Sequence, residues 1–400
     1  MVRIAPNELS FTNPQAWNDI YGMQNGRVQN RKCVDAYTPL QPGFEKGIIH
    51  ADDTTHARLR RIYGPAFTPK ALEEQTDMLL KYADLLITQL KMAVQKQPAQ
   101  DMSAWYNFTT FDLTGDFAFG EAFHCLDRGG EYHFFIKTVF EGVTLGLQMQ
   151  QLEHYGFLSL LKPFIPKSFM KPKEDMDQYT KELVDRRLDR GYETGKMDVF
   201  NYLLLNKNEE DQLTPPELYE NGITLVVAGS ETTATVLTGT TYFLCKNPDK
   251  LRKVQQEVRT MFKEDREITP KSINELSYMI AVLSESMRIY PPTSFGIPRL
   301  IASKGGQSIA GCWVPENVRL IHSMKFQCAL TSLLQTRCSI WHHAAYRYEE
   351  NFTRPEEFVP ERWLPDAPAE FKDDKREVVQ PFMVGPRGCL GKGYVAGTLR

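Results

Sequence analysis

The sequence predicts a mainly α, α+β protein built around one long helix. Helical periodicity broken by Pro and Gly covers most of the chain, a helical pattern of about 33 residues begins near position 214, and short β-like segments follow position 296. The 400 residues contain no internal repeat or low-complexity tract, and large enzymes of this length can be single domains. We therefore expect one domain over 1–400.

Charge and cysteine content exclude several classes of protein. Lys and Arg number 47 and Asp and Glu 50, for a net charge of −3, which predicts no nucleic-acid partner. The seven cysteines include no C-x-x-C pair, as expected of an intracellular protein in a reducing compartment. Residues 1–11 do not resemble a signal peptide, and no later segment reaches the ~18 apolar residues of a membrane span.

The long helix has clear start and stop signals. Thr214-Pro215-Pro216-Glu217 has the form of a capping box, and Asn247-Pro248 ends the helix after about Lys246. Apolar stripes predict two further helices, at about 247–262 and 270–290. These two further helices are expected to face the core.

Short β-like segments follow these helices, at about 296–301 and 307–320. Turn signals at 304–306 and 314–317 separate them.

A glycine-dense loop covers residues 382–393. Gly385 and Gly388 permit left-handed turns, and Gly391 lets a flat ligand approach the backbone. Backbone N–H groups, the following helix N-terminus and Arg387 favour a thiolate at Cys389, the form of cysteine that binds metal. A plain structural turn is the alternative. A Walker phosphate loop is excluded, because five residues separate Gly385 from Gly391 and Lys392 precedes Gly393.

The full pattern Phe382, Gly385, Arg387, Cys389 and Gly391 resembles the F-x-x-G-x-R-x-C-x-G haem-binding signature of the cytochrome P450 family at every fixed position. The resemblance implies a haem b cofactor with Cys389 as the axial ligand of the iron. Electron donation from such a thiolate favours O–O cleavage.

A second motif lies near the middle of the long helix. Residues 228–233 read Ala-Gly-Ser-Glu-Thr-Thr, and a mid-helix glycine costs about 1 kcal/mol relative to alanine. The Thr232 hydroxyl can bond back to the Ala228 carbonyl and bend the helix. The segment resembles the family's A-G-x-[DE]-T-T oxygen-activation motif, which implies that Glu231 and Thr232 relay protons and that Gly229 keeps the backbone low over the porphyrin. A polar stripe facing another helix is the alternative.

Glu285 and Arg288 share a helix face, and Pro360-Glu361-Arg362-Trp363 follows later in the chain. An isolated surface pair of this kind contributes little. Together the segments resemble the family's E-x-x-R and P-E-R-[FW] arrangement. The resemblance implies a structural role, in which Arg362 joins Glu285 and Arg288 in a buried network beneath the haem.

Haem propionate contacts are also implied by the resemblance. His56 and Arg60 lie one helical turn apart on a predicted helix, and Arg299 follows Gly296-Ile-Pro. A solvated basic face is the alternative reading of this helix.

A basic patch is expected to dock an acidic reductase. Arg58, Arg61 and Lys392 are its predicted members, and we expect them to stay exposed on the thiolate side.

Three departures from the family pattern stand out. The first residues look internal to the family pattern, without the membrane anchor that holds full-length eukaryotic members in the endoplasmic reticulum. The last residue, Arg400, falls inside the helix expected after Cys389, and 321–340 interrupts the pattern as an atypical insert. We expect a chain truncated at both ends, with residues near 322–340 translated from an unspliced intron.

The predicted function is insertion of one oxygen atom from O₂ into a small, apolar organic substrate, with electrons from NADPH supplied through a reductase. RIAPNELSF near the start, the residues 52–58 and the 228–233 motif most resemble fungal secondary-metabolism members of the family, including trichothecene-pathway hydroxylases. Two alternatives stay open. A non-catalytic remnant would not bind haem, and a haem-thiolate isomerase or peroxygenase would not need Glu231 and Thr232.

Overall fold

The structure is a computed structural model that describes residues 1–23, 28–33, 47–154, 171–192, 197–205, 212–269, 271–322 and 330–399. The chain divides into two compact units. The sheet unit comprises Met1–Tyr37, Gly239–Lys392 and Arg400, and the helical unit comprises Thr38–Thr238 and Gly393–Leu399. Helices make up most of the described chain, which confirms the mainly α fold class.

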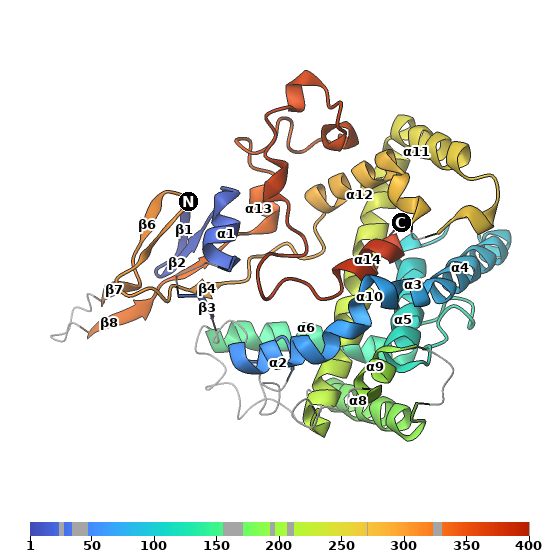
Figure 1. Cartoon of the computed structure of the whole chain (residues 1–400), viewed down its shortest axis with the longest axis horizontal. Coiled ribbons are helices and arrows are strands. Elements are labelled where there is room, and N and C mark those ends of the chain that lie inside the picture. Colours follow the sequence, from blue (N-terminus) through green and yellow to red (C-terminus); the bar gives the residue numbers. More distant parts are fainter. Residues whose placement is uncertain are drawn as a thin grey trace. The chain divides into compact units, whose positions relative to one another are not determined.

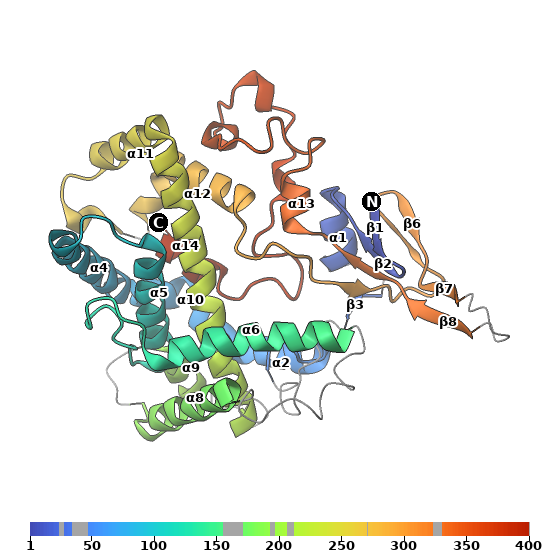
Figure 2. The ribbon, with the colours of Figure 1, turned by 180° about the vertical axis from the view of Figure 1, so that it is seen from behind.

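Described regular structure in the helical unit consists of helices. They are α2 (Asp53–Tyr63), α3 (Pro69–Glu74), α4 (Thr76–Lys96), α5 (Met102–Phe119), α6 (Phe134–His154), α8 (Lys171–Asp189), α9 (Val199–Leu205), most of α10 (Pro215–Lys246) and α14 (Lys392–Leu399), with a short 3₁₀ turn at Gly64–Phe67. Helix α5 is buried along nearly its whole length. Both ribbon views show it beside α10, and the Ser230 hydroxyl of α10 donates to the Thr110 carbonyl of α5 over 3.4 Å (Figures 1 and 2).

Helix α10 confirms the predicted long helix, with bounds at Pro215 and Lys246. Its capping box uses Glu217, whose carboxylate accepts from the Thr214 backbone N–H over 2.8 Å and from the Thr214 hydroxyl over 3.0 Å. Glu217 also forms an ion pair with Arg58 of α2. The start of the long helix is therefore tied to α2 through one carboxylate.

A buried ion pair joins α8 to α9. The Arg187 guanidinium donates to both oxygens of Asp198 over 2.8 and 2.9 Å and to Asn201 over 2.6 Å, and both charged side chains are fully buried. Because a buried charge needs a partner, this fixed geometry holds the two helices in one arrangement.

The sheet unit contains a five-stranded sheet in the order β1-β2-β9-β4-β3, with the N-terminus at the edge strand β1 (Figure 2). β9 pairs parallel to β2 and antiparallel to β4. Its strands are β1 (Val2–Ala5), β2 (Glu8–Ser10), β3 (Arg31–Lys32), β4 (Arg299–Leu300) and β9 (Arg337–Ser339). Two antiparallel hairpins accompany the sheet, β5 (Gln307–Ile309) with β6 (Cys312–Val314) and β7 (Asn317–His322) with β8 (Leu330–Gln335).

Helices of the sheet unit are α1 (Gln15–Tyr21), α11 (Pro248–Met261), α12 (Ser277–Ile289) and α13 (His342–Tyr346), with short 3₁₀ turns at Asp265–Glu267, Ser272–Glu275, Pro360–Trp363, Ala369–Phe371 and Arg376–Val378. The predicted helix at 247–262 is confirmed by α11. The prediction of one helix over 270–290 is wrong at its start, because Leu276 leaves helical geometry at ψ 79°. Glu257 of α11 then caps the new start by accepting the backbone N–H groups of Tyr278 and Met279 over 2.8 and 2.9 Å.

The predicted β segment at 307–320 is divided into three strands. Ala310 and Gly311 both have positive φ, 47° and 79°, which makes the tight turn between β5 and β6. The turn predicted at 314–317 separates β6 from β7.

The stretch expected as an insert, 321–340, includes residues 323–329, which lie outside the described residues. β8 continues the hairpin with β7, and β9 lies within the five-stranded sheet, with Cys338 fully buried. Residues 337–339 are thus part of the sheet core.

Across the described ranges, no helix combines the length and the apolar character needed to cross a bilayer.

Candidate active site

The cysteine loop is folded back on itself by backbone hydrogen bonds. The Cys389 N–H donates to the Phe382 carbonyl over 2.7 Å, and the Gly388 N–H donates to the Gly385 carbonyl over 3.0 Å. The Cys389 side chain is exposed, while Phe382 and Arg387 are half-buried. A soft sulfur donor presented on a self-bonded loop fits a haem iron, for which one protein thiolate suffices as axial ligand.

Gly385 is a site where the loop requires glycine. Its φ is 78°, and a Cβ there would lie 1.9 Å from the Tyr21 carbonyl oxygen. The predicted left-handed turn at Gly385 is therefore confirmed. The same prediction for Gly388 is wrong, because its φ is not positive; Met383, at φ 60°, supplies the second left-handed residue instead.

The turn at residues 228–233, which the sequence predicts as the oxygen-activation motif, lies on α10 in the helical unit. Its Thr232 hydroxyl donates to the Ala228 carbonyl over 2.7 Å, the bond expected from the sequence, and the Thr233 hydroxyl donates to the Gly229 carbonyl over 3.0 Å. The α-helix continues through this turn without a break, so the bonds do not interrupt it. Both threonine hydroxyls satisfy carbonyls that already take part in the helix.

Glu231 combines partial desolvation with access to solvent. Desolvation by the surrounding protein raises the pKa of its carboxyl group, although the side chain itself is exposed. Ala228, Glu231 and Thr232 are spaced to share one helix face, whereas Ser230 and Thr233 are buried on the other side. The exposed face therefore carries an acid that holds its proton more tightly than usual beside a hydroxyl group.

Gly229 lies where α10 packs closely on α5. A Cβ at this position would lie 3.0 Å from Cγ2 and 3.1 Å from Oγ1 of Thr114 on α5. The missing side chain thus permits close packing of the two helices, and the expectation that Gly229 also keeps the backbone low over a porphyrin stays a prediction.

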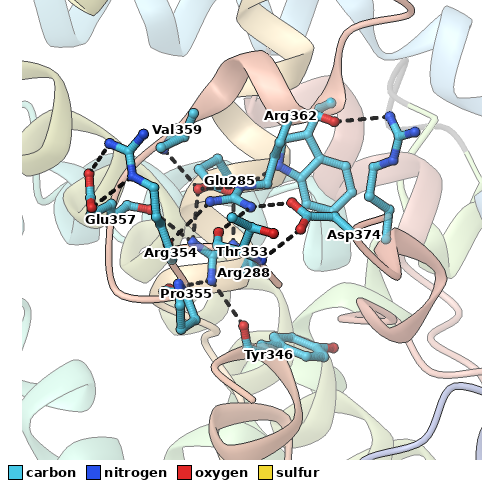
Figure 3. A network of polar contacts seen from close by, with 12 residues as sticks. Glu285, Arg288, Tyr346, Thr353, Arg354, Pro355, Glu357, Val359, Arg362 and Asp374 are labelled. Carbon is cyan, nitrogen blue, oxygen red and sulfur yellow. Dashed lines mark hydrogen bonds and ion pairs between the residues drawn. The ribbon is translucent and has the colours of Figure 1, made fainter. Parts of the chain in front are cut away.

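The structure joins Glu285, Arg288 and Arg362 in one buried network (Figure 3). Glu285 accepts from the Arg288 Nε and Nη2 atoms over 2.8 Å each and from the Arg362 Nε atom over 3.1 Å. All three side chains are fully buried. Because each charge is paired and hydrogen-bonded, the network is stable only as a complete set.

Backbone carbonyls accept hydrogen bonds from most of the remaining guanidinium N–H groups, as Figure 3 shows. Arg288 donates to the carbonyls of Tyr346, Pro355 and Glu357 over 2.6–3.0 Å. Arg362 donates to those of Thr353 and Arg354 over 3.0 and 3.3 Å. The network therefore fixes the path of residues 346–362 to helix α12.

Sequence reasoning missed two members of this network. Asp374 forms an ion pair with Arg362 from a loop whose sequence gives no signal of that contact. The Trp363 Nε1 atom donates to Glu285 over 2.8 Å, and this partner could have been suspected, since Trp363 directly follows Arg362.

The predicted propionate residues are located in both units. In the helical unit, His56 is buried and Arg60 half-buried on α2, with the expected one-turn spacing. In the sheet unit, Arg299 is buried, with its guanidinium carbon 5.6 Å from the centre of the Tyr21 ring. Their assignment to propionates stays a prediction.

The basic patch is different from the one expected at one position. Arg61 and Lys392 are exposed, but Arg58 is half-buried and ion-paired with Glu217. The expectation that Arg58 stays exposed is therefore wrong, because the capping carboxylate of α10 engages it.

Fold and cysteine loop together define a haem-thiolate oxidoreductase. The Cytochrome P450 family model matches residues 9–325 and 335–394, so the chain belongs to the cytochrome P450 family, and it is a monooxygenase. Membership implies a haem-thiolate cofactor, O₂ and a redox partner. The residues left unmatched between the two segments, 326–334, fall inside the stretch expected as an insert and include part of β8.

The chain is similar to monooxygenases of fungal secondary metabolism along its whole length. It is 38% identical to a trichothecene C-4 hydroxylase of Trichoderma arundinaceum, 37% to the cytochrome P450 monooxygenase astA of Talaromyces wortmannii and 36% to the cytochrome P450 monooxygenase astJ of Aspergillus oryzae. Each alignment covers 100% of this chain and 76% of the relative.

Proposed function

We propose that this enzyme inserts one oxygen atom from O₂ into a small, apolar secondary metabolite, using electrons from NADPH delivered by a separate reductase. Cys389 is the axial ligand of a haem b iron, in a loop that also contains Phe382, Gly385, Arg387 and Gly391. The bound haem supplies the oxidising chemistry through its thiolate-coordinated iron. The exposed sulfur on a self-bonded loop is the observation that carries this proposal.

Glu231 and Thr232 are the proposed catalytic residues. Desolvation raises the pKa of the Glu231 carboxyl group, which makes its protonated form easier to reach and suits it to exchange protons beside Thr232. The Thr232 hydroxyl is oriented by its 2.7 Å bond to Ala228 and keeps its oxygen lone pairs available as acceptors. Together they deliver protons in a fixed direction, which favours oxygen activation over isomerase or peroxygenase chemistry.

His56, Arg60 and Arg299 are proposed to hold the haem propionates, and the Glu285, Arg288 and Arg362 network to hold the chain that leads to the cysteine loop. Arg61 and Lys392 are proposed as contacts for an acidic reductase. We also propose an intracellular location, and the sequence resemblance implies that full-length relatives are anchored in the endoplasmic reticulum membrane.

The similarity to a trichothecene C-4 hydroxylase supports a trichothecene-like secondary metabolite as substrate. A direct test supplies the purified haem-loaded protein with NADPH, a fungal reductase and ¹⁸O₂, and offers trichothecene precursors as substrates. One ¹⁸O atom per product molecule, dependent on the reductase, supports the proposal. Turnover driven only by peroxide, or product without ¹⁸O, would indicate one of the two other haem-thiolate chemistries, and failure to bind haem would indicate a non-catalytic remnant.

A further inference from the structure

Thr114 of α5 lies directly against the oxygen-activation turn of α10. The Cβ position of Gly229 is 3.0 Å from its Cγ2 atom and 3.1 Å from its Oγ1 atom, closer than ordinary van der Waals contact. Gly229 also accepts the Thr233 hydroxyl through its carbonyl. Any change in the volume of residue 114 therefore acts on the backbone that carries Glu231 and Thr232.

Thr114 also faces Tyr394 of α14. Tyr394 follows Cys389 closely in the sequence, and α14 begins at Lys392. Its ring stacks on Phe117, with the ring centres 4.3 Å apart and the planes tilted by 21°. Both Thr114 and Phe117 belong to α5, so one face of this helix receives the side chain of Tyr394.

The two hydroxyl groups are buried and lie near each other. Thr114 and Tyr394 are 1% and 4% exposed, and neither hydroxyl has a hydrogen bond of ordinary geometry within the described ranges. Burial raises the pKa of Tyr394, and the nearby hydroxyls of Thr114 and Thr398 oppose that rise. The Thr398 hydroxyl already donates to the Tyr394 carbonyl over 3.0 Å, whereas that of Thr114 is not yet engaged in such a bond. Because an unpaired buried hydroxyl is costly, a hydrogen bond between Thr114 and Tyr394 is favoured.

The same helix α10 offers a matched site without these connections. Gly222 lies two turns before Gly229, and its Cβ position is 3.4 Å from Cγ2 of Thr180 on α8. Thr180 is fully buried, and its hydroxyl also has no partner of ordinary geometry in the described part of the chain. The pair Gly222 and Thr180 thus repeats the glycine-to-threonine contact of Gly229 and Thr114, but it lies away from Tyr394 and from the catalytic turn.

We propose that Thr114 is a positioning residue: it bonds the Tyr394 hydroxyl and sets the spacing of α5 from the turn that carries Glu231 and Thr232. The Thr114 side chain is thereby adjacent to two functional elements. One is α14, the helix that follows the thiolate ligand, and the other is the proton-delivery turn of α10. This inference rests on the proposed monooxygenase function, since it assigns Thr114 to the efficiency of that reaction. It adds a residue from α5, a helix to which neither motif belongs.

The test uses the haem-loaded enzyme with its reductase and measures the ratio of peroxide to product, the reduced carbon monoxide spectrum and thermal unfolding. Thr114→Val keeps the shape and removes the hydroxyl, and Tyr394→Phe removes the other hydroxyl. Each variant should raise the peroxide-to-product ratio about 2- to 10-fold, the range that corresponds to one lost hydrogen bond. The double variant should raise the peroxide-to-product ratio no further than either single variant does. Its unfolding temperature should likewise fall by less than the sum of the two single effects.

Gly229→Ala and Gly229→Ala combined with Thr114→Ser test the packing contact. Gly229→Ala should raise the peroxide-to-product ratio, and the added Thr114→Ser should restore it, because serine keeps the hydroxyl and removes the Cγ2 atom that lies 3.0 Å from the new methyl group. Gly222→Ala and Thr180→Val are the controls, and they should lower only the unfolding temperature.

Two results would overturn the role of Thr114 while leaving the proposed function standing, provided that the thiolate-type carbon monoxide spectrum is intact. One is the absence of rescue by Thr114→Ser, and the other is an equal peroxide-to-product ratio in the Thr114→Val and Thr180→Val variants. Loss of the thiolate-type spectrum in the unmodified enzyme would instead refute the proposed function.

Discussion

The buried network around Glu285 and the turn of α10 around Glu231 use a glutamate in opposite ways. Glu285 is fully buried, and its two oxygens accept from two guanidinium groups, the Trp363 indole and the Val359 backbone. Glu231 is exposed, and partial desolvation raises the pKa of its carboxyl group. The first arrangement stabilises a fixed charge, whereas the second makes the protonated form of the carboxyl group easier to reach. A rigid support and the proton donor proposed for Glu231 thus have different surroundings for the same side chain.

The largest expected effect is on stability, from Glu285→Gln. This change leaves two buried guanidinium groups without their shared charge, which is expected to cost about 3–5 kcal/mol of unfolding free energy. Chemical denaturation measures it. The exposed Glu356, paired with Arg347 at 3.1 Å, is the control, and Glu356→Gln should change stability by less than about 0.5 kcal/mol. Equal effects of the two changes would show that the network is not a structural support.

Gly385→Ala is expected to have the next largest effect. Left-handed geometry costs a non-glycine residue about 1–2 kcal/mol, and the new methyl group would also collide with the Tyr21 carbonyl. Gly305 is a matched control, because its φ is also 78° but a Cβ there would meet nothing within 4 Å. Haem content and the free energy of unfolding measured by denaturation should both fall further in Gly385→Ala than in Gly305→Ala. Equal losses of haem content and stability in the two variants would show that close packing against Tyr21 is not required of the cysteine loop.

A pH-dependent effect is expected at His342 in the sheet unit. Burial lowers the pKa of this histidine, whose Nδ1 atom lies 2.5 Å from the Thr293 carbonyl and whose Nε2 atom has no partner within the described ranges. The neutral form therefore stabilises the fold above the unfolded pKa of about 6.5, and that stability is lost as the pH falls through the lower folded value.

Denaturation at pH 5–7 should show that the free energy of unfolding falls as the pH is lowered. This dependence on pH should be weaker in His342→Phe, a variant that keeps the ring stacking on Tyr346. An unchanged slope in the variant would assign the acid sensitivity to other groups.

The smallest effect on stability is expected from Thr232→Ala. One hydroxyl-to-carbonyl bond is lost, alanine is a better helix former, and the net change should stay below about 1 kcal/mol. The peroxide-to-product ratio should rise nonetheless. Thr238→Ala removes the same kind of bond on the same helix, 2.8 Å to the Ala234 carbonyl, and should leave that ratio unchanged. A rise in both variants would indicate a general loosening of α10.

Local sequence signals predicted α10 and α11 well. The capping box and the proline stops depend only on neighbouring residues, so Thr214, Glu217 and Pro248 were sufficient to place both helices. The start of α12 could not be found in this way, because Glu257 caps it from another helix. Asp374 and Thr114 escaped prediction for the same reason: their partners Arg362 and Gly229 are distant in sequence, and no local pattern marks them.

Motif matching identified the residues of the candidate site but not always their physical reasons. The signature fixes glycine at 385 and 391, yet of these only Gly385 adopts positive φ. Gly229 belongs to the oxygen-activation motif, and in the fold it contacts Thr114. A fixed residue in a family pattern can therefore serve packing, and only the tertiary contacts show which function applies.

The identity of the iron ligand is the central claim, and the reduced carbon monoxide difference spectrum tests it most directly. The unmodified protein should give the red-shifted band characteristic of thiolate ligation, and Cys389→Ser should lose that band while Cys245→Ser, a change at another exposed cysteine, keeps it. A thiolate-type band that survives in Cys389→Ser would contradict the assignment.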